Sequence, residues 1–240
     1  MGLWIAATLC AFFVKGMCGF ANTLVFTGIL SFVNANVAIS PVELLVVYPS
    51  NFILVWAERK SVQWRYCGLL SLLVLAGNIP GVLLLKNADS QAVKLFFGAV
   101  ITALGVEMLL RERQKEQRQQ SKLVLAVIGV LSGVLCGLYG VGALLAAYVS
   151  RVTSDSREFK GTICAVFIVE STFRVVAYTY LGIITAQVVR QALLLLPVML
   201  VGLFLGMKSS QRLDEALARR VVTVALILFG VALIAENLPF

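Results

Sequence analysis

The amino-acid sequence predicts an all-α membrane protein that crosses the bilayer several times. Hydrophobic residues make up 60% of the 240 residues and charged residues only 13%, whereas soluble domains contain roughly 45–50% and 25%, respectively. The hydrophobic residues lie in segments that match the roughly 20 residues a helix needs to cross a bilayer. They are too long, and apolar on too many faces, for the roughly 10-residue alternating strands of a membrane barrel. A helical bundle in lipid is therefore expected.

Eight apolar segments follow one another along the chain, separated by short polar stretches. The first has no basic residue before it, unlike a cleavable signal peptide, so it is expected to stay in the mature protein. The predicted segments are 3–32, 41–57, 64–85, 92–110, 123–149, 159–182, 188–207 and 221–235.

The first and fifth segments share a glycine motif, which predicts an internal duplication. Residues 16–21 (Gly-Met-Cys-Gly-Phe-Ala) correspond to residues 137–142 (Gly-Leu-Tyr-Gly-Val-Gly) at an offset of 121 residues, which becomes 125 after 211–215. The same offset of 121 pairs Ser50 with Ser171, Trp64 with Thr185 and Gly81 with Gly202.

The duplication predicts a first membrane repeat at 1–110, a basic cytoplasmic linker at 111–122 and a second membrane repeat at 123–240. The first segment of each repeat is longer than one crossing needs and has glycines near its middle, where they weaken a helix. Each is expected to form a re-entrant hairpin, so that three full crossings remain in each repeat and the two repeats are inverted. The alternative is eight plain transmembrane helices with parallel halves.

The basic residues favour the inverted arrangement, because Lys and Arg gather in cytoplasmic loops. With inverted halves, 15 of the 20 basic residues lie in inside loops and 3 in outside loops, whereas eight plain spans place nine on each side. Both termini are then outside, and the basic loops are cytoplasmic. The net charge of +8 has the same origin and does not imply nucleic-acid binding.

Ionisable residues inside the apolar segments are candidates for function, because burying them in a membrane is costly. Lys15 directly precedes the first glycine motif, and Glu170 and Arg174 are four residues apart on one helix face. That pair could instead only fix helix packing. Glu43 lies near the outer end of the second segment. Since the chain has no histidine, proton coupling would have to use a carboxylate, with Glu170 and Glu107 as the candidates.

Two glycine-broken hairpins predict one internal polar cavity, because lipid cannot satisfy the backbone groups of non-helical segments. Helix N-termini directed at that cavity would favour an anion, and together with charged and hydrogen-bonding side chains they suit a small oxyanion. The alternative is that the glycines only allow close helix packing. The predicted substrate-binding residues are Lys15, Gly16, Gly19, Asn22, Asn51, Gly137, Gly140, Gly142, Ser171, Thr172 and Arg174.

The chain resembles the sulfite exporter (TauE/SafE) family in its glycine motif near the N-terminus, the echo of that motif at 136–142, the segment around Gly202 and the basic central linker. The resemblance covers nearly the whole chain. It implies a bacterial or archaeal inner-membrane permease that exports sulfite, sulfoacetate or another organosulfur anion. The sequence departs from the family where a glycine run commonly follows each motif, since it has Ala-Asn-Thr at 21–23 and Gly-Ala-Leu at 142–144.

The leading interpretation is a secondary transporter that exports a small anion by alternating access of two inverted halves. A passive anion channel and a structural subunit of a membrane complex are the alternatives. An enzyme is not expected, because HExxH and GxSxG motifs are absent, and no cofactor or metal is expected. The expected partners are the lipid bilayer and a small inorganic or organosulfur anion. Small residues such as Gly98 and Gly105 allow packing within one chain or between two in a homodimer.

Overall fold

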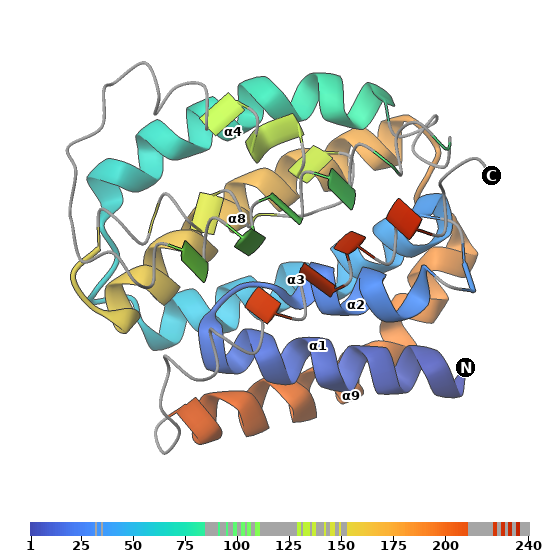
Figure 1. Cartoon of the computed structure of the whole chain (residues 1–240), viewed down its shortest axis with the longest axis horizontal. Coiled ribbons are helices and arrows are strands. Elements are labelled where there is room, and N and C mark those ends of the chain that lie inside the picture. The colour runs from blue at the N-terminus through green and yellow to red at the C-terminus, as the bar shows by residue number, and fades with distance from the viewer. Residues whose placement is uncertain are drawn as a thin grey trace.

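In the computed structural model, the described part of the chain is entirely helical (Figure 1). The structure describes residues 1–31, 33–34, 36–84 and 153–210, together with scattered residues between 91 and 149 and between 223 and 235. The helices described are α1 (Gly2–Cys18), α2 (Asn22–Leu30), α3 (Asn36–Ala57), α4 (Trp64–Leu84), α8 (Ser156–Tyr180) and α9 (Ala186–Ser210).

Among the described helices, four are long and apolar enough to cross a membrane, so the chain is a multi-pass membrane protein. They contain the apolar stretches Ala38–Ala57, Trp64–Leu83, Ser156–Tyr180 and Ala186–Ser210, which correspond to the second, third, sixth and seventh predicted segments. The other predicted spans, 92–110 and 221–235, and the fifth segment at 123–149 lie largely outside the described residues.

Helix α8 begins three residues before the predicted segment, at a side-chain cap. Asp155 precedes the helix in an extended conformation, and its carboxylate accepts a hydrogen bond of 2.8 Å from the backbone N–H of Glu158. Such a cap satisfies a backbone donor that has no partner within the first turn. The cap therefore fixes where α8 starts, and with it the register of the polar residues farther along the helix.

The first apolar segment is interrupted within its glycine motif and reverses direction there. Gly19 and Ala21 have φ values of 82° and 70°, so both lie in the left-handed region between α1 and α2. The rings of Trp4 and Phe26 are 5.7 Å apart, although 22 residues of continuous helix would separate them by about 33 Å. Figure 1 shows α1 and α2 running in opposite directions. The segment therefore folds as a helical hairpin.

The helices form a bundle with α1 and α9 side by side on one flank and α4 on the opposite flank (Figure 1). Helices α3 and α8 lie between them and pack against each other in opposite directions, since Ser40 contacts Tyr178 while the backbone N–H of Gln63 bonds to Thr162. The hairpin tip reaches the beginning of α8, where Cys164 donates its thiol hydrogen to the carbonyl of Gly19 at 3.4 Å.

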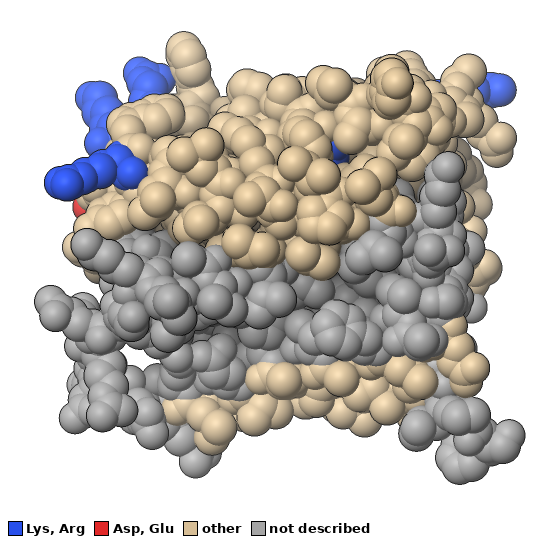
Figure 2. All heavy atoms as spheres, turned by 90° about the horizontal axis from the view of Figure 1, so that it is seen from above, with Lys and Arg blue, Asp and Glu red and all other residues tan. Residues whose placement is uncertain are grey.

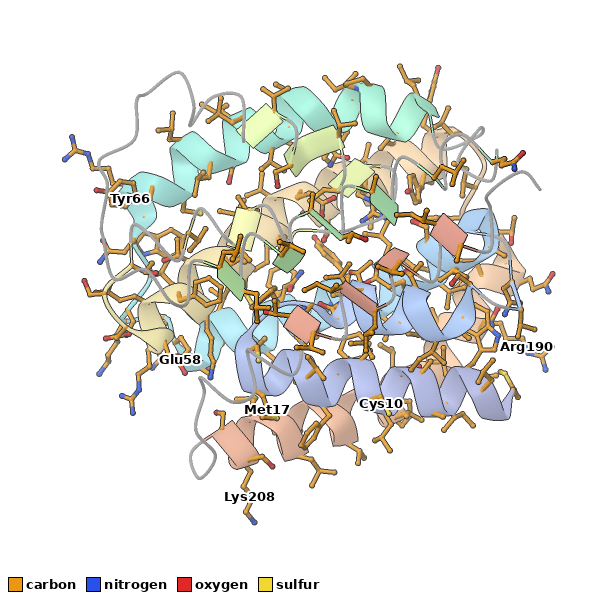
Figure 3. All side chains as sticks on the ribbon, in the orientation of Figure 1. Cys10, Met17, Glu58, Tyr66, Arg190 and Lys208 are labelled. Carbon is orange, nitrogen blue, oxygen red and sulfur yellow. The ribbon has the colours of Figure 1, made fainter. Side chains whose placement is uncertain are left out.

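Basic residues gather at one end of the bundle, which we call the basic end. It comprises the loop between α3 and α4, the start of α8 and the end of α9. Glu58 and Lys208 lie toward this end and Arg190 toward the opposite one (Figure 3). Among the described residues, six basic side chains belong to the basic end and Arg190 to the other, and Figure 2 shows the same imbalance along the long axis. The six are Arg59, Lys60, Arg65, Arg157, Lys160 and Lys208.

Several glycine contacts bring helices to backbone distance, and two of them involve predicted site residues. A Cβ placed on Gly16 in α1 would lie 2.9 Å from the Cα of Gly206 in α9. A Cβ placed on Gly81 in α4 would lie 3.0 Å from the Cα of Gly137. Close packing of small residues is a main source of helix association in membranes. We refer to these contacts as the first and second glycine seams.

Candidate functional site

A polar face on α8 carries a buried ion pair in the middle of the bundle. Glu170 and Arg174 are only 4% and 2% exposed, and Arg174 Nη1 lies 3.5 Å from Glu170 Oε1. Arg174 Nη2 also donates to Ser40 Oγ at 2.8 Å and to Tyr178 Oη at 3.2 Å. Ser171 Oγ donates to Glu170 Oε2 at 3.1 Å. The spacing of one helical turn between Glu170 and Arg174 makes this arrangement local to α8.

Helix α3 places a second polar face opposite α8. Asn51 is fully buried there and accepts a hydrogen bond of 2.6 Å from Lys15 Nζ, which is also fully buried in α1. A lysine ammonium can only donate hydrogen bonds, so its contact identifies the amide oxygen of Asn51. The amide nitrogen of Asn51 is therefore turned away from Lys15.

The start of α2 meets the same face of α3. Asn22 Nδ2 and Thr23 Oγ1 both donate to Glu43 Oε1 at 2.7 Å. The first intrahelical bond of α2 is made by the N–H of Val25 to the carbonyl of Ala21, so the three N–H groups before it are available to another acceptor. The N-terminus of a helix favours negative charge, which Glu43 supplies here.

These residues surround a small polar cavity between α2, α3 and α8. Seven of its twelve lining residues are polar, and they include both carboxylates. The lining residues are Ala21, Asn22, Thr23, Leu24, Glu43, Val47, Asn51, Gly142, Phe167, Glu170, Ser171 and Arg174.

Two lining residues keep a hydrogen-bond donor unused. The Nδ2 atom of Asn51 and the Nε atom of Arg174 are buried and have no hydrogen-bond partner among the residues that the structure describes. An unpaired donor in a buried place is costly, and such groups mark positions where a further acceptor fits. Since both residues line the cavity, the two donors are placed to bind an acceptor inside it.

The buried charges of the site balance one another. Lys15 and Arg174 supply two positive charges, and Glu43 and Glu170 supply two negative charges. Burial of unpaired charges is strongly unfavourable, whereas balanced and hydrogen-bonded groups are tolerated. In the described part of the chain, no three His, Cys, Asp or Glu side chains are grouped to hold a metal ion. The four charged side chains of the site therefore sum to zero.

The structure brings six predicted site residues together around the cavity: Asn22, Asn51, Gly142, Glu170, Ser171 and Arg174. Lys15 contacts the cavity through Asn51. Gly19 lies at the hairpin break, while Gly16 and Gly137 lie in the two glycine seams. Thr172 lies on the exposed face of α8 and hydrogen-bonds Tyr48 Oη at 2.9 Å, outside the cavity. Gly140 and Glu107 lie outside the described residues.

Sequence reasoning did not assign several contacting residues to the site. Glu43 and Thr23 line the cavity. Asn78 donates to Glu170 Oε1 at 3.2 Å, and Ser40 and Tyr178 hold Arg174. One signal was available, because Ser40, Glu43 and Asn51 are spaced by three and eight residues and so share one helix face.

The chain is similar to a known protein family and to a named bacterial protein. The family model described as sulfite exporter TauE/SafE matches residues 4–233. A protein of Cupriavidus necator, named "Probable sulfite/organosulfonate exporter TauE", is 28% identical over 221 residues, which cover 90% of this chain and 86% of that protein. No solved structure matches the chain.

Proposed function

Because the chain belongs to the sulfite exporter TauE/SafE family, we propose that it is a secondary transporter that exports sulfite or an organosulfonate across a bacterial inner membrane. The name of the relative in Cupriavidus necator gives sulfite or an organosulfonate as the exported substrate. Family membership also confirms the prediction of a transporter rather than an enzyme. The cavity between α2, α3 and α8 is the site we assign to the anion.

The two unused donors, Asn51 Nδ2 and Arg174 Nε, are the observation that carries this assignment. A sulfite or sulfonate group has three oxygen atoms, each able to accept hydrogen bonds, and a guanidinium fork suits such a group. The N–H groups at the start of α2 add donors of the kind that bind anions at helix N-termini. Lys15 contributes positive charge and holds the Asn51 amide in its orientation.

We propose that the two halves of the chain are inverted repeats with the boundaries 1–110, 111–122 and 123–240. The glycine seams support this pairing. Gly206 meets Phe13 and Gly16, as Gly81 meets Val134 and Gly137. Phe13 and Gly16 in the first half correspond to Val134 and Gly137 in the second half at the offset of 121 residues. The contacts, however, make Gly206 the counterpart of Gly81, at an offset of 125. The extra four residues of the second half then lie before Gly202, and not at 211–215 as predicted from the sequence.

The directions of the helices at the two seams support inversion. Helix α1 runs parallel to α9, since Leu9 lies near Gly202 and Gly16 near Gly206. Helix α4 starts at the basic end while α9 finishes there, so the two seams point in opposite directions. Inverted repeats around a central site are the common basis of alternating access. In this proposal, the hairpin of α1 and α2 is re-entrant and delivers its helix N-terminus to the anion.

Reconstituted transport tests the proposed function. The purified chain in liposomes is expected to release or take up labelled sulfite and isethionate, a small sulfonate, down an imposed gradient and with saturation. Counterflow, in which excess unlabelled anion accelerates exchange of the labelled anion, is expected of a carrier. Flux without saturation or counterflow would identify a channel, and absence of flux for both anions would refute the proposed function.

Replacing Asn51 by alanine is expected to weaken isethionate binding by about tenfold or more, because a hydrogen bond to a charged group contributes roughly 1.5–3 kcal/mol. Isothermal titration calorimetry on the purified protein measures the change. Thr172→Ala is the matched control, since Thr172 lies on the exposed face of α8, and it should bind like the wild type. If Asn51→Ala and Thr172→Ala bind isethionate with equal affinity, Asn51 does not contact the anion.

The basic end is expected to face the cytoplasm, in keeping with the positive-inside rule. In a chain whose native cysteines are replaced, Lys60→Cys at the basic end should react with a membrane-impermeant thiol reagent only after the inner face is opened to it. Gln187→Cys, at the exposed start of α9, should react in intact cells. The reverse pattern would overturn the orientation and leave the cavity assignment untouched.

A further inference from the structure

We propose that Glu43 carries the proton of this transporter: its carboxylate holds the donors at the start of α2 while the cavity is empty and becomes protonated when a substrate anion takes them. The inference rests on the proposed anion transport and adds the coupling ion and the residue that binds it. The carboxylates that the sequence predicts for this role are Glu170 and Glu107, and Glu43 is not among them.

The contacts of Glu43 are those expected for an anion bound to the hairpin. Its Oε1 atom accepts from both Asn22 Nδ2 and Thr23 Oγ1 at 2.7 Å, and its side chain is 1% exposed. Both donors belong to the first turn of α2, where the helix N-terminus attracts negative charge. The carboxylate therefore occupies the place that a substrate oxyanion would seek, and the two compete for one set of donors.

The charged groups around Glu43 determine whether an anion can bind without leaving an unbalanced charge in the site. Lys15 faces it from α1, and Arg174 and Glu170 face it from α8. The thiol of Cys136 is also within electrostatic reach, and α2 contributes only neutral donors among its described residues. The empty site thus holds two cations and two carboxylates. A singly charged sulfonate would leave one excess negative charge in a buried place, and one proton added to a carboxylate restores neutrality.

Glu43 is better placed than Glu170 to accept this proton. Glu170 is paired with Arg174 at 3.5 Å and also accepts from Asn78 and Ser171, so its negative charge is directly compensated. The hydrogen-bond partners of Glu43 are a neutral amide and a hydroxyl. The hydroxyl of Thr23 can donate to a carboxylate or accept from a carboxylic acid. When Glu43 is protonated it can donate to Thr23 Oγ1, and the hydroxyl hydrogen of Thr23 is then released to the substrate anion.

The Glu43 carboxylate takes up one proton for each monovalent anion that binds, so the net charge of the site is the same before and after binding. The anion and the proton then cross together as an electroneutral pair, so export proceeds only while the outward concentration ratio of the anion exceeds the inward concentration ratio of protons. Anion binding that requires a protonated Glu43 is strong at low pH and weakens as the pH rises.

Calorimetry with isethionate tests this proposal, because a sulfonate stays singly charged over the working range and any proton taken up belongs to the protein. Titrations of the full-length wild type in buffers with different ionisation enthalpies are expected to show about one proton bound per anion and an affinity that falls as the pH rises. Glu43→Gln, which mimics the protonated group, should bind with no proton uptake and no pH dependence. Glu58→Gln, in the loop between α3 and α4, is the control and should behave as the wild type.

Thr23→Val provides a second, milder variant if Glu43→Gln does not fold. It keeps Glu43 but removes one donor to its carboxylate, so the pH at which isethionate binding weakens should move upward. Proton uptake that persists in Glu43→Gln, or an unshifted pH profile in Thr23→Val, would overturn the role of Glu43. Wild-type protein that binds isethionate without proton uptake would overturn it too, while leaving anion transport intact. Wild-type protein that neither binds nor transports sulfite and isethionate would refute the proposed function itself.

Discussion

Replacing Arg174 by glutamine is expected to reduce isethionate affinity by more than a hundredfold and to destabilise the protein. The substitution removes a positive charge and the unused Nε donor, and it leaves Glu170 buried without its counter-ion. Truncating one partner of a buried, hydrogen-bonded charge pair costs about 2–5 kcal/mol in binding and about 3–5 kcal/mol in stability. Calorimetry and thermal unfolding in one detergent measure the two effects.

A double variant separates binding from stability. In Glu170→Gln with Arg174→Gln both charges are gone, so the free energy of unfolding should recover much of what the single variant loses, because no uncompensated charge is buried. Anion affinity should stay low, since the donor is still missing. Arg174→Lys should also bind weakly, because an ammonium does not offer the planar fork that contacts Ser40 and Tyr178. Wild-type affinity in the double variant would remove Arg174 from the anion site.

The site residues that could be predicted from the sequence are the charged side chains that lie within apolar segments. Lys15, Glu170 and Arg174 stood out because charges inside a membrane span need a reason, and the structure places all three at or beside the cavity. The helical class followed from the length and apolarity of the segments. These predictions depend on composition and local spacing, which the fold does not alter.

Other parts of the site depend on tertiary contacts that local spacing does not show. Thr172 follows Ser171 directly, and one residue turns a helix by about 100°, since 3.6 residues complete a turn, so that Ser171 lines the cavity while Thr172 is exposed. Gly16 and Gly19 belong to one motif, yet Gly16 packs against α9 and Gly19 breaks the helix. Ala21 has a left-handed conformation that alanine rarely adopts, so its residue type did not indicate that the turn predicted from the glycines includes it.

The sequence shows that Glu43 lies within an apolar segment, but it does not indicate that this carboxylate belongs to the site. A carboxylate near the end of a predicted span can reach the aqueous interface. The glycines predict a hairpin in the first segment, but they do not indicate that α2 then contacts Glu43 in α3. The hairpin supplies Asn22 and Thr23 as hydrogen-bond partners of Glu43. The carboxylate is therefore buried inside the bundle and does not lie at its surface. A site formed between segments about twenty residues apart is therefore recognised only after the direction of the chain is known.

Replacing Gly16 by alanine is expected to disrupt the first glycine seam and to lower both the unfolding temperature and transport. The added Cβ would lie 2.7 Å from the N of Met207 and 2.9 Å from the Cα of Gly206. Those neighbours are backbone atoms, so they cannot rotate away as a flexible side chain would, and overpacking of this kind costs about 1–3 kcal/mol. Thermal unfolding and isethionate counterflow in liposomes measure the loss.

Gly68→Ala is the matched control, because a Cβ at Gly68 in α4 has no atom within 4 Å. Alanine there should stabilise the helix by about 0.5–1 kcal/mol, so the same substitution has opposite signs at the two positions. Gly81→Ala, in the second seam, should resemble Gly16→Ala if the two halves are equivalent, since its Cβ would lie 3.0 Å from the Cα of Gly137. Loss at Gly16 with none at Gly81 would argue against inverted repeats. Stability equal to that of Gly68→Ala at both positions would show that neither helix pair packs at backbone distance.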